Sequence, residues 1–274
     1  MTTAKALPNY VQRLGLVNGT RIFLKSLRAG PSADGALQSY FIDSYGCVVH
    51  LRPSRADHSI FFQCVVKRQY DISHFPQYRA LMACYQRTLD QGETPLIIDC
   101  GGNIGLSALW FAQQFPRARI VVIEPDQENL RLLRLNVASC AERVTVVEGG
   151  VWNRPARLRI SNPHAGSAAF RVEESTDLNT EGIRAYAIDE LCAIGGSESP
   201  LIVKIDIEGA QATLFSTNTE WTARTALVSL ELDDWLLPWA GTSRPFFRTL
   251  AAQRFDYLLG GESIYCFNAD VLQP

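Results

Sequence analysis

Two patterns of hydrophobic and polar residues divide the chain near residue 95. Beyond this point, short apolar runs with few polar interruptions alternate with amphipathic segments, which is typical of a parallel sheet covered on both faces. Five of the runs end in an acidic residue, and we predict a strand from each: residues 96–99, 120–124, 144–148, 201–206 and 227–231. The pattern therefore predicts an open α/β core.

The segments between these strands predict the rest of the core. Apolar residues recur at helical spacing over residues 106–115 and 128–137, and less clearly over 245–253. The chain after residue 257 is predicted to form a closing hairpin around Gly260 and Gly261. Because ligands of open α/β sheets bind beyond the carboxyl ends of the strands, the strand-end acids should crowd toward one crevice.

The periodicity is weaker over residues 1–94. Strand-like stretches occupy residues 40–42 and 47–51, and a turn at 52–54 precedes a mixed helical segment. A chain of 274 residues can form a core with an appendage. We therefore expect residues 1–94 to be an N-terminal α+β extension that covers the acceptor pocket or forms a homodimer contact, and residues 95–274 to be the ligand-binding domain.

Composition and charge exclude several classes of protein. Apolar residues make up 47% of the chain and charged residues 20%, as in ordinary folded proteins. With a net charge of −2, the chain has no global positive field, so we expect neither a nucleic-acid nor a membrane partner. The seven cysteines are scattered without metal-ligand spacing and are predicted to be reduced thiols. Without a signal-like start or a membrane-length apolar run, a cytoplasmic location is expected.

The strongest local feature is the sequence Asp99-Cys100-Gly101-Gly102-Asn103-Ile104-Gly105, where a predicted strand turns into a helix. Its glycines let the backbone pass close to a ligand, and the helix N-terminus offers unpaired N–H groups. A tight turn without a ligand is the alternative. A pyrophosphate-binding loop should carry further glycines where Asn103 and Leu106 stand, so dinucleotide binding is disfavoured.

Acids at the ends of two later strands are further candidate site residues beside this loop. Glu124 ends the strand that follows it, where a carboxylate accepts hydrogen bonds from ribose hydroxyls, although a solvated strand-end acid is the simpler alternative. Asp206 and Glu208 precede a glycine at the end of another strand, and two such acids can divide charge stabilisation and proton transfer. Alternatively, Asp206 caps the next helix and Lys204 pairs with an acid.

Three motifs in this order resemble the FkbM family of S-adenosylmethionine-dependent methyltransferases: IDCGGNIG at 98–105, IEP at 123–125 and VKIDIEGA at 203–210. The likeness extends over about residues 50–268. It implies a class I methyltransferase fold, which is a Rossmann-like seven-stranded sheet whose last strand pair is antiparallel. It also implies O-methylation of a hydroxyl on a small molecule such as a sugar or a polyketide-type natural product.

The resemblance assigns cofactor contacts to particular positions. Asp99, Gly101, Asn103 and Gly105 would hold the methionine end of S-adenosylmethionine, Glu124 its ribose, and Glu148, Val151 and Trp152 would border its adenine. Trp152 is equally well explained as a core residue. The chain departs from the family pattern on the acceptor side, where Gln211 replaces a second glutamate and Leu232-Asp233 replaces a histidine after the glutamate at 231.

An alcohol acceptor must lose its proton during methyl transfer. Asp206 is the first candidate for base or orienting group, with Glu208 and Glu231 next, because burial at a strand end raises a carboxyl pKa. The same acids could instead hold Mg²⁺. His164, within residues 161–169, is a weaker candidate. A nicotinamide-dependent oxidoreductase and a non-catalytic cofactor-binding module of a biosynthetic complex remain alternatives.

Overall fold

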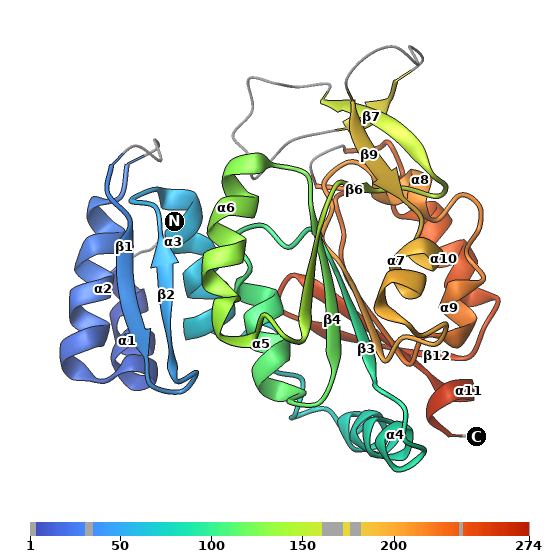
Figure 1. Ribbon diagram of the computed structural model, residues 1–274, viewed down its shortest axis with the longest axis horizontal. Helices are drawn as coiled ribbons and strands as arrows, with labels where there is room; N and C mark the ends of the chain where they lie inside the picture. The colour runs from blue at the N-terminus through green and yellow to red at the C-terminus, as the bar shows by residue number, and fades with distance from the viewer. Residues whose placement is uncertain (1–3, 31–34, 161–171, 176–181, 236–237, 274) are drawn as a thin grey trace.

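The computed structural model describes residues 4–30, 35–160, 172–175, 182–235 and 238–273. A central sheet with helices on both faces forms the larger part, and a group of helices with a two-stranded hairpin lies beside it (Figure 1). The latter, residues 4–66, is called the N-terminal part below.

The central sheet has seven strands in the order β12-β13-β11-β10-β3-β4-β5. β13 runs antiparallel to both of its neighbours, and the pairs β11–β10, β10–β3, β3–β4 and β4–β5 are parallel. This confirms the class I methyltransferase sheet with an antiparallel last pair. Its strands are β3 (Leu96–Cys100), β4 (Arg119–Glu124), β5 (Val144–Glu148), β10 (Ile202–Ile205), β11 (Leu227–Glu231), β12 (Phe255–Gly260) and β13 (Ser263–Asn268).

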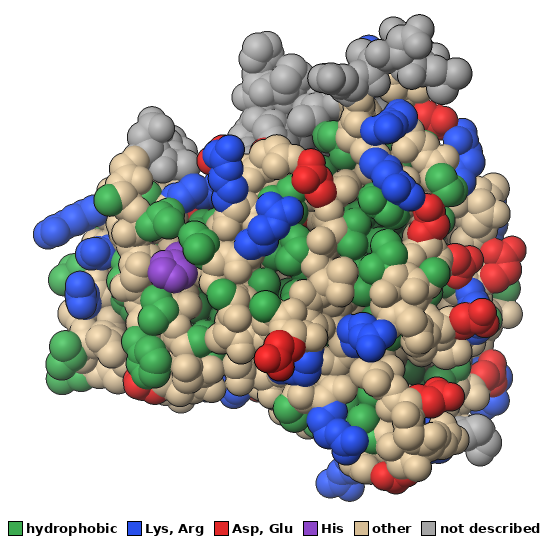
Figure 2. Space-filling model, in the orientation of Figure 1, with side chains coloured by type: hydrophobic (Ala, Val, Ile, Leu, Met, Phe, Trp, Pro, Cys, Tyr) green, Lys and Arg blue, Asp and Glu red, His purple; other side chains and the backbone are tan. Residues whose placement is uncertain are grey.

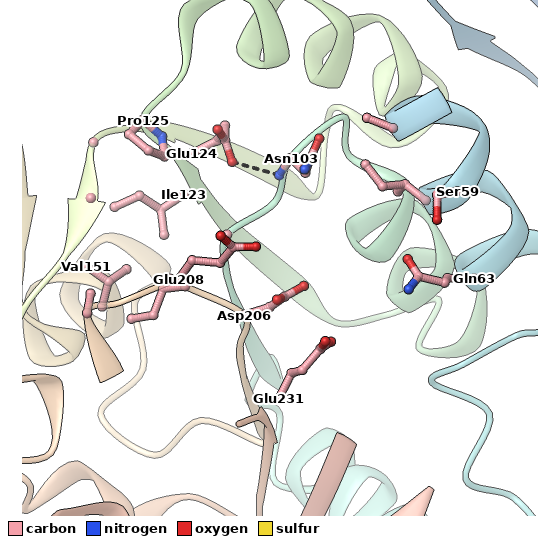
Figure 3. A pocket seen from close by; sticks show the side chains of 17 residues that line it. Ser59, Gln63, Asn103, Ile123, Glu124, Pro125, Val151, Asp206, Glu208 and Glu231 are labelled. Carbon is pink, nitrogen blue, oxygen red and sulfur yellow. Dashed lines mark hydrogen bonds between the residues drawn. The ribbon is translucent and has the colours of Figure 1, made fainter. Parts of the chain in front are cut away.

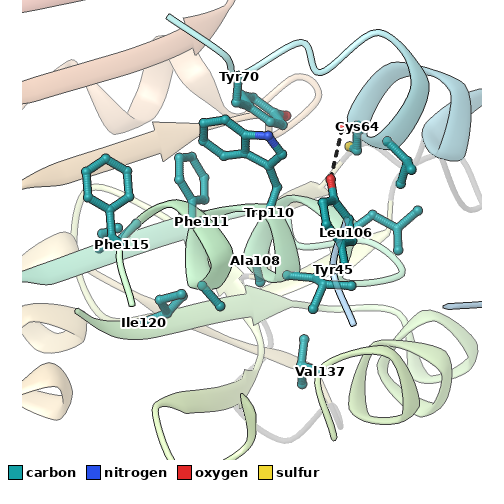
Figure 4. Close-up of a cluster of buried hydrophobic side chains, with 14 of the residues drawn as sticks. Tyr45, Cys64, Tyr70, Leu106, Ala108, Trp110, Phe111, Phe115, Ile120 and Val137 are labelled. Carbon is teal, nitrogen blue, oxygen red and sulfur yellow. Dashed lines mark hydrogen bonds between the residues drawn. The ribbon is translucent and has the colours of Figure 1, made fainter. Parts of the chain in front are cut away.

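Helices cover both faces of this sheet because side chains alternate along each strand. In β3, Ile97 joins the hydrophobic cluster under α5, whereas Leu96 and Ile98 join the cluster under α7 and α10. Figure 4 shows the first cluster, where Trp110 and Phe111 of α5 lie beside Tyr70. The helices are α4 (Tyr78–Asp90), α5 (Leu106–Gln114), α6 (Gln127–Asn136), η3 (Ala138–Cys140), α7 (Ile188–Gly195), α8 (Gln211–Leu214), α9 (Trp221–Arg224), α10 (Arg244–Ala251) and α11 (Ala269–Leu272).

The N-terminal part contains two helices that the sequence pattern did not predict, α1 and α2. The apolar residues of α2 form one wide arc around the helix, of which one part is buried and the other exposed. The expected strands at residues 40–42 and 47–51 form the hairpin β1–β2. The elements of this part are η1 (Ala4–Ala6), α1 (Leu7–Leu14), α2 (Leu16–Arg28), β1 (Gln38–Ile42), β2 (Cys47–Leu51), α3 (Arg55–Phe61) and the π-helix η2 (Phe62–Val66).

The N-terminal part shares one hydrophobic cluster with the central sheet. Tyr10 and Val49 belong to the same continuous cluster as Ile97 and Val122 of β3 and β4. The proposed domain boundary after residue 94 stays a prediction.

A small second sheet lies beyond β5, and the sequence analysis did not foresee it. Its strand order is β6-β9-β7-β8, with β6 and β9 parallel and the other two pairs antiparallel. The strands are short, which weakens any periodic signal. They are β6 (Gly150–Val151), β7 (Ala156–Ile160), β8 (Val172–Glu174) and β9 (Ile183–Tyr186).

Two expectations from composition can be compared with the structure. All seven cysteines are buried free thiols, in agreement with the prediction of reduced side chains. Within the residues that the structure describes, every helix is too short or too polar to cross a membrane.

Asn136, at the end of α6, joins β2 of the N-terminal part to the glycine-containing loop after β3. Its side-chain oxygen accepts a hydrogen bond from the His50 N–H at 2.7 Å, and its amide donates to the carbonyls of His50 at 3.1 Å and Ile104 at 2.8 Å. The residue is 1% exposed. This side chain therefore links three segments that are far apart in the sequence.

We predict that Asn136→Ala lowers the free energy of unfolding by about 1–3 kcal/mol, because buried backbone groups lose their partners. Urea denaturation of the two proteins measures this difference. Asn18→Ala, at an exposed position of α2, is the matched control and should stay within about 0.5 kcal/mol of the parent. An equally stable Asn136 variant would show that the link contributes nothing to folding.

Candidate active site

A cleft of about 380 Å³ opens at the carboxyl ends of β3, β4, β10 and β11. Its volume is within the range of about 300–1,000 Å³ that is usual for small-molecule sites. One wall comes from the N-terminal part, where Ser59 and Gln63 face the strand ends (Figure 3). The lining residues are Ala56, Ser59, Ile60, Gln63, Gly101, Asn103, Ile123, Glu124, Pro125, Gly149, Gly150, Val151, Asp206, Ile207, Glu208, Ala210 and Glu231.

The loop after β3 approaches the end of β10 so closely that only glycine fits at its first position. Gly101 has a φ of +82°, and a β-carbon there would lie 1.9 Å from the main-chain oxygen of Asp206. Asn103 also has a positive φ, 47°, which asparagine tolerates better than most residues. Its N–H donates to Oε2 of Glu124 at 2.8 Å (Figure 3). The loop is therefore fixed against the adjacent strand end.

Glu124 presents a nearly buried carboxylate to the cleft. The residue is 5% exposed, and its Oε1 accepts from the Asp126 N–H at 3.1 Å and from the Asn129 amide at 3.2 Å. Burial raises its pKa to about 6, although the bonds from Asp126, Asn129 and Asn103 oppose this shift. A carboxylate has about four acceptor positions, so these three donors leave one, on Oε2.

A hydrogen-bonded chain connects Glu124 to the N-terminal part. The Arg52 guanidinium donates to Oδ1 of Asn129 at 2.7 Å. It also forms a two-pronged ion pair with Asp57, with Nη2–Oδ1 at 2.9 Å and Nε–Oδ2 at 3.0 Å. Asp57 is fully buried at the start of α3. Sequence reasoning missed the roles of Arg52 and Asn129, because their pairing joins positions 77 residues apart.

Lys204 is buried beneath the cleft and holds three groups together. Its Nζ lies 2.9 Å from Oδ1 of Asp99 and 3.4 Å from Oδ2 of Asp206, and it donates to the carbonyl of Gly101 at 2.7 Å. Burial lowers the pKa of Lys204, but the carboxylates of Asp99 and Asp206, with Tyr70, outweigh this effect and raise it well above its ordinary value. The ammonium ion is therefore a permanent charge in this site.

Asp206, Glu208 and Glu231 extend into the cleft from the ends of β10 and β11 (Figure 3). Burial, and then the neighbouring charges of Asp206, Glu262 and Glu208, raise the pKa of Glu231 to about 8. Every ionisable residue that lines the cleft is an acid, and no described lysine or arginine does so. The site therefore favours a positively charged ligand over an anionic one.

The predicted site residues fall into two groups. Seven line the cleft: Gly101, Asn103, Glu124, Val151, Asp206, Glu208 and Glu231. Four do not, namely Asp99, Gly105, Glu148 and Trp152. For all eleven, a role in binding or catalysis stays a prediction. His164 lies outside the described residues.

Each of the four has a structural role at its position. Asp99 is fully buried and pairs with Lys204 and the Ser107 hydroxyl, and Gly105 precedes α5 in the left-handed conformation. Trp152 packs in a small hydrophobic cluster with Leu158 and Ala185. Glu148 accepts a hydrogen bond from Gln127.

The positions that depart from the family pattern lie between the ends of β10 and β11. The Gln211 amide donates to the main-chain carbonyl of Glu231, and Asp233 accepts from the Gly209 N–H at 3.0 Å. Gln211 and Asp233 are both 3% exposed. These two side chains therefore join the loop after β10 to the end of β11 and fix the spacing of the acids.

The question of Mg²⁺ was left open by the sequence. Within the described part of the chain, no group of three or more His, Cys, Asp or Glu side chains is arranged to hold a metal ion.

Comparison with known proteins gives a family match over the part of the chain that contributes the strand ends of the cleft. The family described as Methyltransferase FkbM domain matches residues 99–236. A curated relative, the 2-O-methyltransferase NoeI of Sinorhizobium fredii (strain NBRC 101917 / NGR234), is 22% identical in an alignment 156 positions long that covers 51% of this chain and 64% of the relative. The chain thus spans somewhat less than two thirds of that protein.

Solved structures give weaker likenesses. Methyltransferase FkbM from Methylobacillus flagellatus KT is 17% identical, with 64% of this chain and 44% of that chain covered and a TM-score of 0.44. Cofactor-bound Rv0187 from MTB is 16% identical, with 78% and 96% covered and a TM-score of 0.40.

We predict that Lys204→Met lowers the free energy of unfolding by about 3–5 kcal/mol, because it leaves the buried charge of Asp99 unpaired. Lys204→Met combined with Asp99→Asn should recover much of this loss, since the buried charge is then removed. Chemical denaturation of the parent, both single variants and the double variant measures the coupling. Additive effects of the two substitutions would show that the ion pair is not the source of the loss.

Proposed function

Because the chain belongs to the FkbM family of methyltransferases, we propose that it binds S-adenosylmethionine in the cleft and transfers the methyl group to a hydroxyl of a small molecule. The main support is the acidic lining of the cleft, to which Glu124, Asp206, Glu208 and Glu231 contribute.

The charge of the cleft favours S-adenosylmethionine over a nicotinamide dinucleotide as the ligand. A sulfonium ion and an amino group are cations, and acids stabilise them at short range. A nicotinamide dinucleotide carries a pyrophosphate instead, and an acidic site where no described lysine or arginine lines the wall would repel it. The glycine loop also lacks the spacing of a pyrophosphate-binding loop, with Asn103 at its second glycine position.

The residues present fit the proposed ligand. Glu124 retains one acceptor position for a ribose hydroxyl, and the bond from Asn103 orients its carboxylate. Ile123, Pro125 and Val151 supply an apolar surface for the purine. When bound, S-adenosylmethionine supplies an electrophilic methyl group on a positively charged sulfur. The rigid loop and strand ends align the reacting groups, which is the main source of rate in such a displacement.

Glu231 is best placed to take the proton of the acceptor hydroxyl. Its pKa of about 8 is close to the working pH of a general base, whereas the Asp206 carboxylate is held by the Lys204 ammonium ion at 3.4 Å. We therefore assign proton removal to Glu231 and orientation of the hydroxyl to Asp206. Glu208, at the same edge of the cleft, adds negative charge near the donor.

A neutral hydroxylated molecule such as a sugar fits the acceptor side. Ser59 and Gln63 provide uncharged polar groups on the wall opposite the acids. The acids themselves would repel a phosphorylated acceptor. The relative NoeI is by its name a 2-O-methyltransferase. Incubation with S-adenosylmethionine and a panel of neutral sugars and short oligosaccharides, followed by mass spectrometry, tests the proposal through a mass gain of one methyl group. A panel without any methylated product would oppose sugar methylation.

We predict that S-adenosylhomocysteine raises the melting temperature and NAD does not, because only a true ligand stabilises the folded state by mass action. Glu124→Gln should weaken S-adenosylhomocysteine binding by about 10–100-fold, as expected for a charged hydrogen bond. Isothermal titration calorimetry measures both affinities. Glu128→Gln, on the exposed side of α6, is the matched control and should bind normally. Binding of NAD alone would support the oxidoreductase instead.

The rate of methyl transfer should rise with pH through about 8 and then level off, because Glu231 acts only when deprotonated. Glu231→Gln should lower kcat by about 10²–10⁴-fold and remove this rise. Asp206→Asn should also lower kcat strongly while S-adenosylhomocysteine affinity stays nearly unchanged. The measurement is a pH profile of kcat on a sugar that the panel shows to be methylated. A profile of Glu231→Gln that still rises through pH 8 would exclude Glu231 as the base.

A further inference from the structure

Helix α2 carries a row of apolar side chains that nothing in the described structure covers. The adjoining face, with Ile22 and Phe23, is buried in the N-terminal part. The exposed row consists of Leu16 (72% exposed), Val17 (79%), Leu24 (46%) and Leu27 (50%). Helical geometry places these four within one side of the helix. We call them the apolar stripe.

Three cations lie along one edge of the apolar stripe. At 100° per residue, Arg21, Lys25 and Arg28 follow the apolar stripe around the helix before the buried face begins. They line the same shallow groove as Leu16, Val17 and Leu24. Figure 2 shows lysine and arginine side chains beside hydrophobic ones at the left edge of the molecule, where Figure 1 places α2.

All charged side chains in the sequence around α2, residues 1–33, are positive. Residues 1–33 contain five lysines or arginines and no acid, since Asp34 is the first acidic residue of the chain. The whole chain has a net charge of −2, and from this average we expected no membrane partner. The average conceals a positively charged first segment.

We propose that α2 docks on the surface of an anionic lipid bilayer. The apolar stripe would enter the boundary between headgroups and acyl chains, and Arg21, Lys25 and Arg28 would lie against the lipid phosphates. An apolar stripe with adjacent cations is the arrangement by which helices lie in a membrane interface without crossing it. The helix has 13 residues and is about 20 Å long.

Charge argues against a second copy of the chain as the occupant. A symmetric contact between two copies of α2 brings like charges together, and no acid within residues 1–33 can pair with them. An anionic surface instead attracts all three cations of the stripe edge.

The docking surface is connected to the cleft wall. Arg55, the first residue of α3, donates through Nε to the carbonyl of Ala29 at 3.1 Å, and its N–H donates to the carbonyl of Gly30 at 2.9 Å. The end of α2 is thus fixed to the helix that carries Ser59 of the cleft. Docking would hold that wall at a constant position relative to the bilayer. The proposal does not depend on the methyl acceptor.

Sedimentation of the full chain with vesicles tests the proposal. We expect binding to vesicles of phosphatidylcholine mixed with phosphatidylglycerol, little binding to phosphatidylcholine alone, and a decrease with added salt. The variant Leu16→Ser/Val17→Ser/Leu24→Ser should bind at least tenfold more weakly. Arg21→Gln/Lys25→Gln/Arg28→Gln should lose about fivefold for each cation. Because all these side chains reach solvent, circular dichroism and S-adenosylhomocysteine affinity should be unchanged.

The matched control is Leu135→Ser/Leu259→Ser, which removes apolar side chains that are 47% and 76% exposed outside α2. It should bind the mixed vesicles as the parent does. The proposal would be overturned if the parent does not bind the mixed vesicles. It would also be overturned if the triple serine variant and the triple glutamine variant bind them as strongly as the parent does. Light scattering is the second measurement: a parent dimer that the stripe substitutions dissociate would assign the stripe to a second copy of the chain and also overturn it.

Discussion

The buried ammonium ion of Lys204 is the interaction on which the cleft depends. It neutralises Asp99 inside β3, forms an ion pair with the Asp206 carboxylate at the end of β10, and donates to the carbonyl of Gly101 in the loop after β3. A charge in such a place is stable only when all of its partners are present. The loop after β3 and the end of β10 are thereby held together. They can approach so closely because Gly101 has no β-carbon.

The cleft is a product of both parts of the molecule. Arg52 reaches Asn129, which in turn holds Glu124, so the carboxylate proposed to bind ribose is oriented from the N-terminal part. Ser59 and Gln63 complete the opposite wall.

Charged side chains of one sign gather in two separate regions, the cleft and residues 1–33. In the cleft, acids gather at the ends of several strands and no lysine or arginine among the described residues lines it, which suits a cationic donor; the pKa of Glu231 is raised, which suits a proton acceptor. Along the first segment, cations gather without an acid, which suits an anionic surface. Neither feature is visible in the net charge of the whole chain.

The sequence by itself determined the sheet and the general place of the site. Runs such as residues 120–124 are apolar on both faces, which only a covered parallel sheet satisfies, and their terminal acids must meet at one edge. Glu124, Asp206 and Glu231 were found in this way. Short-range signals of this kind require no knowledge of distant contacts.

Only the tertiary structure decided which of the predicted residues line the cleft and which lie outside its lining. Asp99 is paired with Lys204 and does not line the cleft, and Gln211, which stands where the family has a second glutamate, donates a hydrogen bond to the end of β11. Helix α2 was not predicted, and only the structure shows which part of its apolar surface is buried and which part is exposed. In each case the outcome depends on pairing between residues far apart in the chain, and local pattern carries no information about which partner a side chain will meet.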